Sequence, residues 1–147
     1  MDKGVAVALA AAVGGVVVVQ GPLNSQLGRT VGGLEASVVA LGISFASVLM
    51  LSVVTGGIGG VRNIGDAPWY VAVGGGLAGA AFIASLVWLV RALGVGGLTA
   101  TLIAAQLGVA MVIDHYGWLG VEKSPITAAK LAGLALLATG TWLIVRE

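Results

Sequence analysis

Residues 36–61 read ASVVALGISFASVLMLSVVTGGIGGV, a stretch of 26 residues without a charged side chain. A helix needs about 20 apolar residues to cross the hydrocarbon core of a bilayer, because each residue adds about 1.5 Å. Strands of a membrane barrel alternate apolar and polar residues instead. Runs such as Val16–Val19 and Leu134–Leu137 do not alternate. The stretch therefore predicts a membrane-spanning helix.

Four more segments of similar length are free of charge or nearly so. Residues 4–28, 67–90 and 92–113 contain no charged side chain, and residues 125–145 contain only Lys130. The chain is therefore predicted to be all-α and polytopic, a single transmembrane domain over residues 1–147 with five helices. Their expected bounds are 4–28 with a kink at 21–22, 35–56, 68–91, 97–115 and 125–145. The first segment is expected to remain as a helix rather than to be a cleaved signal peptide, since its small residues lie in mid-run.

The composition excludes most soluble classes. Of 147 residues, 59% are hydrophobic and 9% charged, whereas soluble domains carry about 25% charged residues. The net charge of +1 offers no field for nucleic acid, and the absence of cysteine with one histidine argues against disulfide scaffolds and common zinc sites. Neither a phosphate-binding loop nor a plausible triad is present. We expect no enzyme, no catalytic residue, no cofactor and no metal.

The positive charges are almost evenly divided between the two sides of the membrane. Five crossings would place Lys3, Arg62, Lys123 and Lys130 on one side and Arg29, Arg91 and Arg146 on the other. Because lysine and arginine bias sets orientation, such a balance predicts insertion both ways. Two copies in opposite orientations would form an antiparallel homodimer of ten helices, an inverted repeat made from two chains. The alternative is one fixed orientation with a weak bias, helped by a partner chain or by the order in which the helices insert.

Polar residues gather around a break in the first segment. Pro22 follows Gly21, removes one backbone donor and disturbs the helix. Interrupted helices point to the binding site of a transporter. Gln20 and Asn24 are four residues apart, hence on one face, and Gln26 lies nearby. These three are candidate substrate-binding residues; the alternative is that the helix ends near Gln20 and a polar turn follows.

Four further residues are candidates. Gln106 lies within the fourth segment, where it would either bind substrate or form a hydrogen bond to a neighbouring helix. Ser44 lies on a helical stripe with other serines, and Trp88 would stack on substrate or anchor the chain at the headgroups. Glu35 is a candidate for coupling, although a carboxylate at a helix N-terminus is also favoured by the helix dipole.

Three motifs resemble a known family. Gln20–Gly28 (QGPLNSQLG) resembles the first-helix signature of YdcZ-type inner-membrane exporters, which are short five-helix members of the drug/metabolite transporter superfamily. Ala105–Gly108 with Asp114–Gly117 is similar to their fourth helix, and Ser124–Thr127 with Leu131–Gly133 to their fifth. The resemblance spans essentially the whole chain. It implies a dual-topology or paired antiparallel assembly in a prokaryotic inner membrane, and transport of a small molecule.

A more local likeness concerns the last segment. Gly133–Gly140 (GLALLATG) is similar to the glycine heptad through which small multidrug resistance transporters dimerise. This resemblance implies that Gly133, Leu137 and Gly140 lie at the protomer contact. Those relatives carry a functional carboxylate in mid-membrane in the first helix, where this chain has only amides.

The function expected from the sequence is alternating-access transport of a small molecule at the interface between protomers. An amide-lined site without a buried charge favours a neutral or zwitterionic substrate. The expected partners are a second copy of the chain and membrane lipid. Two alternatives stay open: a non-transporting scaffold subunit, and a protein that binds or moves lipid.

Overall fold

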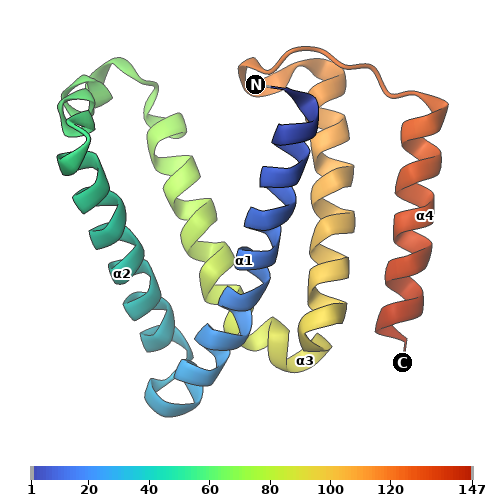
Figure 1. Cartoon of the computed structure of the whole chain (residues 1–147), viewed down its shortest axis with the longest axis horizontal. Coiled ribbons are helices and arrows are strands. Elements are labelled where there is room, and N and C mark those ends of the chain that lie inside the picture. The colour runs from blue at the N-terminus through green and yellow to red at the C-terminus, as the bar shows by residue number, and fades with distance from the viewer. Residues whose placement is uncertain (1, 147) are drawn as a thin grey trace. The chain divides into compact units, whose positions relative to one another are not determined.

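The computed structural model describes residues 2–146, and every regular element within them is a helix (Figure 1). The all-helical class expected from the charge-free segments is therefore confirmed for this part of the chain. In chain order the elements are α1 Lys3–Val31, α2 Gly33–Val54, the 3₁₀ helix η1 Gly57–Asp66, α3 Trp69–Tyr116, the 3₁₀ helix η2 Trp118–Gly120 and α4 Ala128–Val145.

The four α-helices are each long and apolar enough to cross a membrane. Their large apolar side chains lie mostly on the outside; Val7 of α1 is 68% exposed and Val54 of α2 is 78% exposed. Water would be an unfavourable solvent for such surfaces, since burial of apolar area drives the folding of soluble domains. The helices therefore present the surface of a protein that is surrounded by lipid.

A single glycine joins α1 to α2. Gly32 has φ of 104°, a value that L side chains rarely adopt, and its N–H donates to the carbonyl of Gly28 at 3.2 Å. At the other end of α1, the Asp2 carboxylate accepts from the N–H of Gly4 at 2.8 Å and supplies the cap that a helix N-terminus needs. The two helices therefore form a hairpin with almost no loop.

Helix α3 is interrupted by one residue. Its backbone is helical from Trp69 to Tyr116 except at Gly94, where φ is 68° and ψ is 173°. This conformation is essentially restricted to glycine. The expected helices 68–91 and 97–115 thus lie in one element on the two sides of Gly94, so four helices rather than five are counted as candidate spans.

The chain divides into two compact units, one ending at Arg91 and the other beginning at Ala92. In the second unit, the part of α3 after Gly94 packs against α4. The Thr141 hydroxyl donates to the carbonyl of Ala100 at 3.1 Å, and a Cβ placed on Gly97 would lie 3.5 Å from Val145. Leu98, in the same part of α3, is buried.

The start of α4 differs from the expected position 125. Thr127 caps the helix, its hydroxyl accepting from the N–H of Lys130 at 3.3 Å. The Lys130 ammonium donates to the hydroxyl of Ser124 at 2.7 Å and to the carbonyl of Pro125 at 3.0 Å. Because these bonds hold Ser124 and Pro125 in the preceding loop, the helix begins at Ala128.

Replacing Gly94 by valine tests the break in α3. We expect Gly94→Val to lower the free energy of unfolding by about 1–3 kcal/mol, because valine does not tolerate this backbone conformation. Gly96→Val is the matched control, since Gly96 is helical and has open space around it. The measurement is unfolding in mixed detergent micelles followed by circular dichroism. Equal effects of the two substitutions would contradict the assigned conformation.

Candidate functional site

Helix α1 continues through Gly21 and Pro22 to Val31 and does not end near Gln20. Pro22 has no N–H, so the carbonyl of Val18 loses the donor that a regular helix would provide. Most residues of α1 before Gly21 are exposed, whereas four residues from Gly21 onward are buried: Gly21, Asn24, Ser25 and Gly28. The packed part of α1 therefore begins at Gly21, next to the proline.

The packed part of α1 lies against the first part of α3. A Cβ placed on Gly28 would lie only 2.9 Å from Val87, and one on Gly21 would lie 3.7 Å from Val90. Val87 is fully buried by this contact. Glycine at these positions allows the two helices to approach closely, as small residues do between membrane helices.

Arg91 ties the same two helices together by hydrogen bonds. Its Nε donates to the hydroxyl oxygen of Ser25 at 3.3 Å, and its Nη2 donates to the carbonyl oxygen of Ser25 at 3.1 Å. Hydrogen bonds from a charged donor are stronger than neutral ones. We call the contacts of Gly21, Ser25 and Gly28 with Val87, Val90 and Arg91 the α1–α3 clamp.

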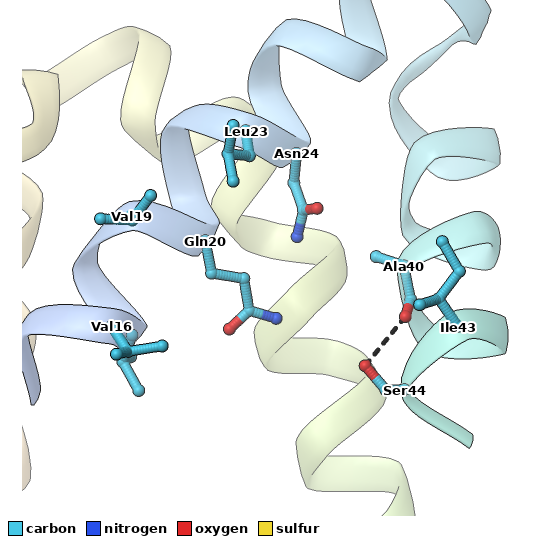
Figure 2. A pocket seen from close by; sticks show the side chains of 9 residues that line it. Val16, Val19, Gln20, Leu23, Asn24, Ala40, Ile43 and Ser44 are labelled. Atoms are coloured by element: carbon cyan, nitrogen blue, oxygen red, sulfur yellow. Dashed lines mark hydrogen bonds between the residues drawn. The ribbon is translucent and has the colours of Figure 1, made fainter. Parts of the chain in front are cut away.

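A groove of about 630 Å³ lies between α1 and α2. Figure 2 shows its polar side chains, Gln20 and Asn24 from α1 and Ser44 from α2, among apolar ones. Its volume is in the range of pockets that hold small molecules. The lining residues are Val16, Val17, Val19, Gln20, Leu23, Asn24, Ala40, Ile43 and Ser44.

Asn24 is the most unusual residue of the groove. It is 7% exposed, and its Nδ2 has no hydrogen-bond partner among residues 2–146. In Figure 2 its amide lies on the same side of α1 as the half-buried amide of Gln20. A buried donor without an acceptor costs about 1–3 kcal/mol. The unpaired donor thus lowers the stability of the folded protein, and packing alone does not explain why this residue is an asparagine.

Ser44 offers the groove an oxygen rather than a proton. Its hydroxyl donates to the carbonyl of Ala40 at 2.9 Å, the dashed line in Figure 2. Ser47, one turn further along α2, makes the same bond to Ile43 at 2.8 Å but does not line the groove. The two serines therefore differ chiefly in their access to the groove.

Other candidate residues of the first unit lie elsewhere. Gln26 is exposed on α1 and does not line the groove. Trp88 is 49% exposed, and its indole packs over Gly33, where an added Cβ would lie 3.1 Å from the ring. The Glu35 carboxylate folds back over Gly32 at the N-terminus of α2 and occupies the space that a Cβ there would need.

The remaining candidates belong to the second unit, which is described by itself. Gln106 is exposed on α3. On α4, Gly133 is exposed and Leu137 and Gly140 are half-buried. Among the described residues, no atom lies within 4 Å of the Cβ position of Gly133 or Gly140. The α4 glycines therefore leave open space beside the helix.

Sequence reasoning missed the α1–α3 clamp. The available signal was the row of small residues Gly21, Ser25 and Gly28, which repeats every three or four positions and so lies on one helical face. As for metals, the structure between residues 2 and 146 has no group of three or more His, Cys, Asp or Glu that could hold an ion.

Comparison with known proteins supplies the family. The family model described as "Putative inner membrane exporter, YdcZ" matches residues 5–143. The chain belongs to this family. The expected resemblance to YdcZ-type exporters is thereby confirmed, and so is the location in the inner membrane. No curated protein and no solved structure matches the chain. Membership of the YdcZ family, together with the apolar helices, supports a membrane exporter rather than an enzyme.

The α1–α3 clamp can be tested by filling its closest contact. We expect Gly28→Val to lower the free energy of unfolding by about 1–3 kcal/mol, since the new side chain would overlap Val87. Gly14→Val on the exposed part of α1 is the matched control, because nothing lies near its Cβ position. Thermal unfolding of both variants in the same detergent is the measurement. A Gly28 variant as stable as the Gly14 variant would refute the close contact.

Proposed function

We propose that the chain is a dual-topology exporter that moves a small molecule by alternating access within an antiparallel homodimer. The observation that carries the proposal is the groove between α1 and α2. It is open, it is lined by a helix that contains a proline, and it holds a buried amide nitrogen without a partner among residues 2–146. Membership of the YdcZ-type exporter family supports transport as the purpose of this groove.

The proposal requires five crossings, and the length of α3 supports them. A helix of 48 residues would be about 72 Å long, more than twice the thickness of a hydrocarbon core of about 30 Å. With Gly94 as a turning point, each part of α3 has the length of one crossing. The termini then lie on opposite sides, and the Lys and Arg residues divide four against three.

A second copy would complete the groove. Within the first unit the early part of α1, which supplies Val16 and Val17, is exposed, so the groove has an uncovered side. The open space beside Gly133 and Gly140 on α4 would admit the close approach of a helix from the other protomer. Leu137, between these glycines, would pack in the same contact.

The packing of α1 supports a specific motion. The α1–α3 clamp holds α1 from Gly21 onward, whereas the residues before Gly21 are free of such contacts within the first unit. Pro22 has removed one backbone bond, so bending there is cheap. Movement of the early part of α1 about Pro22 would widen or narrow the groove at Gln20 while Asn24 stays in place.

The other candidate residues lie outside the groove, and the proposal does not depend on them. Gln26, Trp88 and Gln106 do not line this groove, and their role in substrate binding stays a prediction. Glu35 lies at the N-terminus of α2, where the dipole favours a carboxylate without any coupling role. Its role in coupling stays a prediction as well.

Orientation is tested by labelling single cysteines from each side of intact cells. The native chain has no cysteine, so Thr30→Cys and Asn63→Cys report two ends of the membrane domain without background. We expect each position to be labelled from both faces, because the charge bias is weak. Labelling of each position from a single face, opposite for the two positions, would refute the antiparallel homodimer.

A charge-shifted variant is the control for this experiment. Asn63→Lys combined with Asp66→Lys adds positive charge beside Arg62 and should collapse the population into one orientation. In this variant, a cysteine introduced by Thr30→Cys should then be labelled from one face only. If it still labels from both faces, the labelling reports leakiness of the cells rather than topology.

A further inference from the structure

The groove contains no charged side chain. All residues that line it between α1 and α2 are apolar, amide or hydroxyl residues. Arg91, the charged residue of the α1–α3 clamp, directs Nε and Nη2 to Ser25 and does not line the groove. A ligand with a full charge would lose its hydration here without gaining a counter-ion.

The buried hydrogen-bonding atom of the groove that lacks a partner is a donor. Asn24 Nδ2 is buried and has no acceptor among the described residues. The Ser44 proton is already engaged by Ala40, so this hydroxyl presents lone pairs only. The surrounding walls are aliphatic, with Val16, Val19 and Ile43 among them. Asn24 Nδ2 therefore lacks an acceptor, and the groove offers apolar contact around it.

We infer that the groove binds an uncharged amphiphilic molecule whose carbonyl, ether or hydroxyl oxygen accepts a hydrogen bond from Asn24. This inference rests on the proposed function, since it names the substrate class of that exporter. The apolar body of the molecule lies along the valine, leucine and isoleucine walls. Nδ2 is covered in the empty groove, so the Asn24 amide turns about its terminal torsion, which has broad minima, to meet the ligand. The same lack of counter-charges among the lining residues disfavours zwitterions, which the sequence alone left open.

Four probes that share one apolar body separate the classes of ligand. They are 4-phenylbutyramide, which is uncharged and has a carbonyl acceptor, 4-phenylbutylamine as the cation, 4-phenylbutyrate as the anion and homophenylalanine as the zwitterion. Binding of each labelled probe is measured on the protein in phosphatidylcholine nanodiscs, with empty nanodiscs subtracted. We expect saturable binding of the amide, and binding at least about tenfold weaker for each charged probe.

Variants of the groove tie this binding to Asn24. Asn24→Leu keeps the size of the side chain but removes the donor, so we expect binding of 4-phenylbutyramide to fall at least about tenfold. The same substitution should raise the unfolding temperature of the empty protein, because the unpartnered donor is gone. Ser47→Ala is the control: it removes a hydroxyl that does not line the groove, so binding should be unchanged. Ser44→Ala removes the hydroxyl that does line the groove, so binding should weaken.

Each contrary outcome identifies what has failed. If a charged probe binds as tightly and Asn24→Leu abolishes its binding, the groove is the site but the substrate class is wrong. If Asn24→Leu lowers the unfolding temperature and leaves binding unchanged, Asn24 is a structural residue and the inference is overturned. Binding of none of the probes, or phospholipid retained in the groove, overturns it too. The topology measured by cysteine labelling does not depend on any of these results.

Discussion

A peptide group in hydrocarbon has no water to bond to, and each N–H or C=O left without a partner there costs several kcal/mol. Helices meet this requirement within one segment, which is why a valine-rich stretch such as residues 16–19 is helical despite its modest helix propensity. Exceptions to regular helix bonding are accordingly few in the described chain and fall at particular residues. Pro22, Gly32 and Gly94 are the ones that shape the molecule.

Pro22 has its effect through its neighbours. On one face of the helix around it, Gly21, Ser25 and Gly28 pack against α3, where the Arg91 guanidinium donates to Ser25. On another face of the same turns, Gln20 and Asn24 line the groove toward α2. One short segment of α1 thus combines a rigid contact with an adaptable polar surface. A binding site gains precision when its residues stand on an element that is itself held in place.

The helices were predictable because absence of charge is a property of each segment alone. The pairing of Gln20 with Asn24 followed from helical spacing, and the same spacing explains why Gln26 does not join them: two residues turn a helix by about 200°, to the opposite face. The bond between Arg91 and Ser25 joins residues 66 positions apart, and no periodicity reports such a contact. The start of α4 was missed for a related reason, since Lys130 holds Ser124 through a side-chain bond.

The one-residue junction at Gly32 has a consequence for biogenesis. With no loop between them, α1 and α2 must enter the bilayer together as a helical hairpin, since neither can be threaded while the other waits in water. The tip of that hairpin is flanked by Arg29 and Glu35, whose charges cancel. Carrying the tip across the membrane therefore moves no net charge against the membrane potential, and the electric field gives the nascent hairpin no preferred direction.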